Sequence, residues 1–364
     1  MLPFVQHGID SETIVRASFE FFIGREAVVM KRTRLFRIAI SILLSCLIFL
    51  TACSNATKGD EEAEYVLRLG HLQTETHPYH KGALHFKKLV EERSAGRIRV
   101  DIFPASQLGN GRDQVEGLQL GTIHFHIGSV APVTNFAPEF NVLNLPYLFE
   151  SREHAFRVLD GEIGAEIAKG LEPVGILNLG FMENGWRHLT NDVKPIKTAA
   201  DASGMKIRVQ ESPPYLAFIK SLGSTPVPIP FGELYTALEQ KVVDGQENPL
   251  AQILLNKFDE VQRYMTLSAH NYDAAVFLMS KPVFDKLPDD LQAIVRDAGK
   301  EATDLERKVA KQEESQYLQQ LKESGMQIEE NPDLESFKKA VEPVYKQFEA
   351  SIGKELIDEI KLLK

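Results

Sequence analysis

The sequence predicts an α/β fold with mainly parallel sheets. Through most of the chain, segments in which apolar and polar residues alternate, as in half-buried strands, are followed by segments with the apolar spacing of helices. This βαβα order is typical of α/β architectures. The 364 residues are enough for two domains with substantial cores. One long amphipathic helix in the C-terminal third has the length to brace two lobes, although such helices more often cover a core.

The first half of the chain body contains four predicted strands and four predicted helices. Ile98, Val100 and Ile102 alternate with polar residues, which is the pattern of a half-buried strand. Pro78 stands in the first turn of a helical segment, where its missing N–H costs nothing. By the same criteria, strands are expected at 65–72, 98–102, 123–127 and 174–179, and helices at 78–93, 112–120, 151–160 and 161–169.

The second half begins with a predicted strand at 205–209, which helices at about 214–221, 231–240 and 248–257 follow. Pro288-Asp289-Asp290 opens the long helix. A helix of about 30 residues spans roughly 45 Å, which is more than the width of one small domain. Its apolar stripe consists of Leu291, Ile294, Val295, Ala298, Ala302, Leu305 and Val309.

Residues 1–64 are expected to direct and tether the protein rather than to fold. The stretch MKRTRLFR begins at Met30 and carries four basic residues, and an apolar run over 38–50 follows it. A spanning helix needs about 20 apolar residues, so this shorter run suits the core of a signal peptide. Residues 1–29 show no such pattern and are interpreted as an over-extended gene start.

The apolar run ends in Leu50-Thr51-Ala52-Cys53. Small residues before a cysteine resemble the processing box of bacterial lipoproteins, in which the cysteine is acylated and becomes the first residue. The interpretation is a signal peptide over 30–52, lipidation at Cys53 and a polar tether over 53–64, which together anchor an extracytoplasmic protein to the cell membrane. The alternative is a plain secretion signal with an incidental cysteine.

Composition and missing motifs narrow the function. The net charge is −10 and the chain body has no basic cluster, which argues against nucleic acid as a partner. The two cysteines, Cys46 and Cys53, rule out a disulfide framework and a cysteine-rich zinc site. The motifs G-x-S-x-G, H-E-x-x-H and G-x-x-x-x-G-K-[ST] do not occur. No catalytic residue, cofactor or metal is therefore predicted.

Two groups of histidines are candidate ligands for a metal or a small molecule. His124 and His126 share one face of a strand and could hold a metal, but no third ligand lies nearby, so partly buried strand histidines are the preferred interpretation. A second group surrounds the first strand–helix junction, and His80 and His85 do not share a helix face. One or two of this group, His77 among them, could contact a ligand, because strand ends form the crevice of α/β sheets.

The region 184–250 carries the most specific pattern. Arg187 stands beside the only tryptophan, and Arg208 lies between Ile207 and Val209 in an apolar strand, so its side chain points opposite to theirs. Parallel strands are usually covered on both faces, which favours a guanidinium held for an anion over a solvated one. Downstream, Asn248 is a plausible helix N-cap or pocket amide.

FGELYTALEQKVVDGQENP, with GMKIRV upstream, resembles the motif of solute-binding proteins of tripartite ATP-independent periplasmic (TRAP) transporters, the DctP-like family. FPASQLGNGRD and LPYLF match further family landmarks, and the likeness covers about 65–350. The resemblance implies a two-lobed periplasmic-binding-protein fold with the ligand in a cleft between the lobes. It also implies a long bracing helix and, as partners, the small and large membrane subunits of the transporter. The expected lobes are 65–184 plus 274–313 and 185–273 plus 314–364.

The resemblance also implies roles for single residues. Arg208 matches the arginine that pairs bidentately with the ligand carboxylate, and Asn248 matches an amide that donates to it. Arg187 matches a second carboxylate-binding arginine of sialic-acid-type members, and Phe231 matches an aromatic pocket wall. Sialic-acid binders carry a Glu-Ser pair where this chain has Gly128-Ser129-Val130, so an acid that grips a polyol is missing.

These expectations point to a non-catalytic receptor for a small carboxylate ligand. The loops expected to face Arg208, Arg187 and Asn248 offer mainly neutral donors and acceptors, and Arg112 is their one candidate cation. The neutral groups include Gln73, Thr74, Thr76, His77, Asn110 and Ser129. Such groups suit hydroxyls, which predicts a sugar acid of uronate or aldonate type. A C4-dicarboxylate is the alternative ligand. An extracytoplasmic carboxylate-handling enzyme and a sensor-accessory receptor are the alternative functions.

Overall fold

The computed structural model describes residues 63–363. The predicted signal peptide, the lipidation site at Cys53 and most of the tether lie outside the described residues. Within 63–363, no helix combines the length and the apolar character that crossing a membrane requires.

The described part of the chain builds a nine-stranded mixed sheet in the order β2-β1-β3-β8-β4-β7-β5-β6, with β9 beside β8. Five of the strand pairings are parallel, and the antiparallel ones all involve β4 or β8. The strands are β1 Tyr65–His71, β2 Ile98–Phe103, β3 Phe125–Ser129, β4 Ile176–Asn191, β5 Lys206–Val209, β6 Thr225–Pro228, β7 Gly245–Pro249, β8 Tyr264–Ser280 and β9 Gln327–Glu329.

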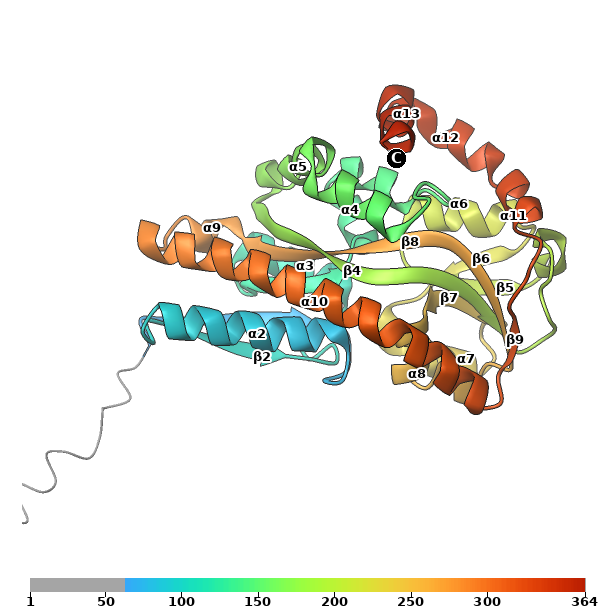
Figure 1. Ribbon diagram of the computed structural model, residues 1–364, viewed down its shortest axis with the longest axis horizontal. Helices are drawn as coiled ribbons and strands as arrows, with labels where there is room; N and C mark the ends of the chain where they lie inside the picture. The colour runs from blue at the N-terminus through green and yellow to red at the C-terminus, as the bar shows by residue number, and fades with distance from the viewer. Residues whose placement is uncertain (1–62, 364) are drawn as a thin grey trace, which may run out of the picture. The chain divides into compact units, whose positions relative to one another are not determined.

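The strand order divides the structure into two lobes. The long strands β4 and β8 run through the middle of the sheet, with β1, β2 and β3 on one side of them and β5, β6 and β7 on the other (Figure 1). We call the elements around β1, β2 and β3 lobe I, and those around β5, β6 and β7 lobe II. The helices are α2 Pro78–Arg93, α3 Gly111–Leu120, α4 Arg152–Asp160, α5 Glu162–Lys169, α6 Pro213–Ser221, α7 Leu234–Glu239, α8 Leu250–Leu255, α9 Lys281–Phe284, α10 Asp289–Glu323, α11 Leu334–Ala340, α12 Glu342–Ile352 and α13 Lys354–Leu362.

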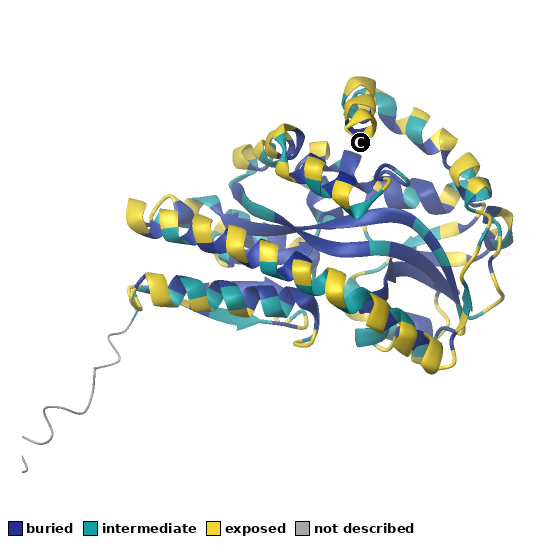
Figure 2. Cartoon of the chain, in the orientation of Figure 1, coloured by how far each residue is buried: buried dark blue, intermediate teal, exposed yellow. Residues whose placement is uncertain are grey.

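The long helix α10 braces the two lobes, as its length predicts. Leu291 and Val295, near its start, belong to the apolar cluster of lobe I, around Phe86 on α2. Tyr317 and Leu321, near its end, belong to the cluster of lobe II. Figure 2 shows the buried face of α10 turned toward the sheet and an exposed face turned outward.

Several predictions of secondary structure need correction. The strand expected at 174–179 continues to Asn191 as β4, and the seventeen-residue strand β8 was not predicted. Register shifts break the pairing of β4 with β8, and β8 buries polar residues such as Asp273, so neither strand shows a clean alternation. The helix expected at 248–257 begins only at Leu250, because residues 245–249 form β7. Asn248 is therefore a strand residue and not a helix N-cap.

Candidate ligand cleft between the lobes

A cleft lies where the ends of β1 and β3 face the end of β5. Its outer compartment is a cavity of about 130 Å³, lined from lobe I by Leu72, Asn110, Gly111, Arg112 and Pro132 and from lobe II by Arg208, Gln210, Glu211 and Pro228–Phe231. Its inner compartment, of about 20 Å³, shares Gln210 and Phe231 with the outer one and adds Tyr79, Ser129 and Asn248. Both compartments lie at carboxyl ends of parallel strands, where α/β sheets bind ligands.

A larger cavity of about 1000 Å³ lies elsewhere, and Tyr147, Trp186 and Leu318 are part of its wall. The two cations in its lining are already paired. Arg152 contacts Glu183 and Glu314, and Lys338 contacts a neighbouring glutamate on α11. Size alone therefore does not identify the site of anion binding.

Arg208 is a buried cation without a carboxylate partner. Its side chain leaves β5 on the cleft side, while Ile207 and Val209 pack into the core. Only 1% of Arg208 is exposed, its Nε donates to the carbonyl of Ile229 at 2.9 Å, and its buried Nη1 has no hydrogen-bond partner. Burial lowers the pKa of the guanidinium to about 9; Glu247 opposes this shift and Arg187 adds to it. The group stays protonated at neutral pH and contributes a positive charge to the wall of the outer compartment.

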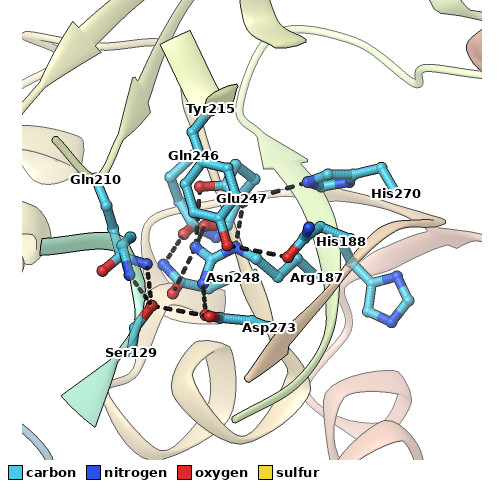
Figure 3. A network of polar contacts seen from close by, with 12 residues as sticks. Ser129, Arg187, His188, Gln210, Tyr215, Gln246, Glu247, Asn248, His270 and Asp273 are labelled. Carbon is cyan, nitrogen blue, oxygen red and sulfur yellow. Dashed lines mark hydrogen bonds and ion pairs between the residues drawn. The ribbon is translucent and has the colours of Figure 1, made fainter. Parts of the chain in front are cut away.

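Arg187 on β4 is fully buried but is neutralised. It pairs with the Glu247 carboxylate through Nε and through Nη2, the latter at 2.9 Å, and Nη1 donates to Asp273 Oδ2 at 2.5 Å. The Tyr215 ring lies beneath its guanidinium at 5.1 Å. Burial alone would raise the pKa of Glu247, but Arg187 and His270 outweigh it and hold that pKa below its usual range. Figure 3 shows this network from close by.

Asn248 is joined to this network. Its Oδ1 accepts a hydrogen bond from Arg187 Nη2 at 3.1 Å, and its amide nitrogen donates to Gln246. The β7 register pairs Asn248 with His188 of β4, and Gln246 with Arg208 of β5. Three adjacent strands thus bring Arg187, Asn248 and Arg208 together. Only Arg208 and Asn248 line the cleft compartments.

The other predicted residues differ in their positions. Phe231 lines both compartments. Ser129 lines the inner one, where its Oγ donates to Asp273 at 2.8 Å and accepts from Gln210 of lobe II. Asn110 lines the outer one, but its side chain caps α3 by accepting from the Asp113 amide. His77 lines neither compartment, because it caps α2 and contacts the Gln252 side chain.

Several cleft residues were not predicted from sequence. Tyr79 lines the inner compartment with a buried hydroxyl that has no partner. Asp273 reaches the cleft through Ser129 from a strand that was not predicted. Gln210 and Glu211 directly follow β5, and the rule that ligands gather at such strand ends would have found them.

The histidine pair does not form a metal site. His124 Nδ1 accepts from the Arg68 amide at 2.7 Å, and His126 Nδ1 bonds to the Gln114 side chain at 2.8 Å. Burial lowers the pKa of His126 to about 4, which keeps it neutral. No group of three or more His, Cys, Asp or Glu residues suited to a metal occurs within residues 63–363.

Comparison with known proteins agrees with this geometry. The family model DctP, described as bacterial extracellular solute-binding protein, family 7, matches residues 69–351. The 2,3-diketo-L-gulonate-binding periplasmic protein YiaO of Escherichia coli K12 is 34% identical over 76% of this chain and 84% of that protein. A TRAP periplasmic solute-binding protein of Polaromonas sp. JS666, solved with D-erythronate, has a TM-score of 0.81 and 39% identity, covering 82% of this chain and 99% of that one.

A second solved structure, from Sulfurospirillum deleyianum and bound to succinate, has a TM-score of 0.80 and 36% identity, covering 83% of this chain and 100% of that one. The match spans most of the chain at substantial identity, and it includes the two lobes and the cleft. The chain belongs to the DctP family of extracellular solute-binding proteins, the receptors of TRAP transporters.

Proposed function

We propose that this receptor captures a sugar acid of uronate or aldonate type and delivers it, chemically unchanged, to the small and large membrane subunits of a TRAP transporter. The observation that carries the proposal is the guanidinium of Arg208, which lines the outer compartment, has no carboxylate partner and leaves its Nη1 without a hydrogen bond. Its planar fork of donors matches a carboxylate in both distance and orientation. Membership of a family of binding proteins supports capture rather than catalysis.

The neutral and acidic character of the remaining cleft favours hydroxyls over a second carboxylate. Arg112, the candidate second cation, is shared between Glu116 at 3.0 Å and Glu211 at 3.5 Å. Relatives that bind diketogulonate and erythronate support the sugar-acid assignment. The succinate-bound relative keeps a C4-dicarboxylate as the second candidate.

Calorimetry and thermal unfolding with a panel of acids test the proposal. Glucuronate, galacturonate, gluconate and erythronate are compared with succinate and malate at constant ionic strength. A ligand at one hundred times its Kd stabilises the folded state by about 2.7 kcal/mol, which thermal unfolding detects readily. We expect at least one sugar acid to bind more tightly than both dicarboxylates, and to be recovered unchanged by mass spectrometry. Tight binding of succinate with no response to sugar acids would contradict the ligand assignment, and a converted ligand would contradict the receptor assignment.

We also propose that the lobes meet at 184/185 on β4 and at 273/274 on β8. Lobe I would then comprise 65–184 plus 274–313, and lobe II 185–273 plus 314–364. Support comes from a register shift between Glu183 and Gly185, opposite Ala274 and Asp273, and from the positive φ of Gly185, 110°. Bulges of this kind bend a strand locally.

Anchoring to the membrane through a lipid on Cys53 is a further part of the proposal, and it rests on the Leu50-Thr51-Ala52-Cys53 sequence. We expect Cys53→Ser to move the protein from the membrane to the soluble fraction without changing ligand affinity. Mass spectrometry of the mature N-terminus checks this. An unmodified Cys53, or a mature terminus elsewhere, would contradict it.

A further inference from the structure

Glu211 stands at the mouth of the cleft, three residues after Arg208. Its Oε1 lies 3.5 Å from Nη1 of Arg112 on α3, and its carbonyl accepts from the Asn135 side chain at 3.2 Å. Arg112 also donates through Nε to Glu116 Oε1 at 3.0 Å. Glu211 and Arg112 both line the outer compartment, whereas Glu116 does not.

The charges at this mouth do not cancel. One guanidinium faces two carboxylates, those of Glu116 and Glu211, so the group carries a net negative charge. Arg208, Arg112 and Glu211 line this one compartment, so a ligand that pairs its first carboxylate with Arg208 and extends toward α3 brings its far end to this group. A second carboxylate there meets like charge, which costs binding free energy.

A hydroxylated far end meets a different environment. An ionised carboxylate can only accept hydrogen bonds, while a hydroxyl can donate one. Glu211 can therefore accept from a ligand hydroxyl but cannot bond to a second carboxylate. Such charge-assisted bonds are roughly twice as strong as neutral ones.

Residue 128, which lines the inner compartment from lobe I, has no room for an acidic side chain. A Cβ added to Gly128 would lie 2.4 Å from His126 Nε2, and that ring is held by its bond to Gln114. The acid within reach of the outer compartment comes instead from lobe II.

We propose that Glu211 determines specificity, by accepting hydrogen bonds from the hydroxyls of a sugar acid and repelling the second carboxylate of a dicarboxylate. This inference rests on the proposed function, because it assumes that Arg208 holds the first carboxylate.

The test compares Glu211→Gln with Glu116→Gln. Both variants remove one negative charge and one partner of Arg112, but only Glu211 lines the compartment. Calorimetry measures the Kd of gluconate, galacturonate, succinate and malate for each variant and for the wild type at constant ionic strength. We expect Glu211→Gln to lower the preference for sugar acid over dicarboxylate by about tenfold or more. The substitution removes the negative charge that repels a dicarboxylate and the charge-assisted bond that holds a sugar acid, and both losses reduce the preference. Glu116→Gln should leave the preference within about twofold, as expected for an exposed ion pair.

Two outcomes would overturn the inference while leaving the proposed function intact. One is an unchanged preference in Glu211→Gln when the wild type binds sugar acids. The other is an equal weakening of both ligand classes, which would reduce Glu211 to an interlobe contact through Arg112. A wild type that binds no sugar acid would instead contradict the proposed function itself.

Discussion

Arg187 and Arg208 lie on β4 and β5, the two strands that flank β7, and each is at most 1% exposed. Arg187 is surrounded by Glu247 and Asp273, while Arg208 bonds to a carbonyl and leaves Nη1 unpaired. A buried charge is tolerable when it is paired and is costly when it is not. The contrast separates a cation that holds the structure together from one that can bind an anion.

The same contrast suggests a structural role for Arg187. Arg187 contacts Asn248, which lines the inner compartment, while Arg187 lines neither compartment. We infer that it positions Asn248 and balances Glu247, and that Arg208 supplies the free positive charge. Replacing each arginine by methionine, which keeps much of the side-chain volume, separates these roles.

Arg187→Met is expected to give the largest loss of stability. It leaves the carboxylates of Glu247 and Asp273 buried without their cation, and removing one partner of a buried ion pair typically costs about 3–5 kcal/mol. Urea unfolding followed by circular dichroism measures the loss. If the variant does not fold, adding Glu247→Gln and Asp273→Asn should restore stability, because no unpaired carboxylate then remains. A stable single variant would show that the network is not needed for folding.

Arg208→Met is expected to remove binding without loss of stability. Truncating one partner of an enclosed charge pair typically costs about 2–5 kcal/mol of binding free energy, so the Kd for the preferred acid should rise at least thirtyfold. The unfolding free energy of the ligand-free protein should be unchanged or higher, since an unpaired buried charge is removed. Calorimetry and urea unfolding on one preparation check both. Near wild-type affinity would end the assignment of Arg208.

How far the sequence anticipates this site depends on the strand that carries each residue. Arg208 interrupts a short apolar strand, so strand alternation and the usual covering of parallel strands on both faces together predicted a buried guanidinium, and the structure shows one. Asp273 was not foreseeable in this way, because β8 was not recognised as a strand. Its polar residues are buried beside β4, and only pairing across about 90 residues of sequence explains them.

The helices were easier to predict than the partners of the side chains. The bounds 78–93 match α2, and the long helix matches α10, because both depend on local spacing and on a proline at the start. That Asn110 and His77 use their side chains to cap helices depends on where each chain segment enters its helix. Composition does not carry that information.

His126 is a third buried basic side chain, and it differs from Arg187 and Arg208 because it is uncharged at neutral pH. Burial lowers its pKa to about 4, below the ordinary value of 6.5. Between these pH values the unfolded chain binds a proton that the folded protein does not, so stability present above pH 6.5 is lost as the pH falls. The loss is at most about 1.4 kcal/mol per pH unit for one histidine.

Between pH 6.5 and 4, His126→Asn should therefore lower the slope of the unfolding free energy against pH by up to about 1.4 kcal/mol per pH unit. Asparagine keeps a nitrogen donor for Gln114 but does not titrate. Urea unfolding at half-unit steps of pH measures the slope. Some slope should remain in the variant, because His71 and His188 also have pKa values lowered by burial, to about 3. An unaltered slope would mean that His126 is charged in the folded protein.

The smallest expected effect separates two tyrosine hydroxyls that differ as the two arginines do. Tyr79 Oη is buried without a partner in the wall of the inner compartment, whereas Tyr215 Oη donates to Asn271 at 3.0 Å and lines neither compartment.

A hydrogen bond contributes about 0.5–1.5 kcal/mol, which corresponds to roughly a two- to twelvefold change in Kd. Tyr79→Phe should weaken ligand binding by that factor and leave the unfolding free energy unchanged or higher, because an unpaired buried hydroxyl is removed. Tyr215→Phe should lower the unfolding free energy by about the same amount and leave the Kd unchanged. Calorimetry and urea unfolding on both variants measure the four values. If Tyr79→Phe changed stability but not affinity, an unpaired buried polar group would no longer identify a ligand contact in this cleft, and the assignment of Arg208 would rest on its charge alone.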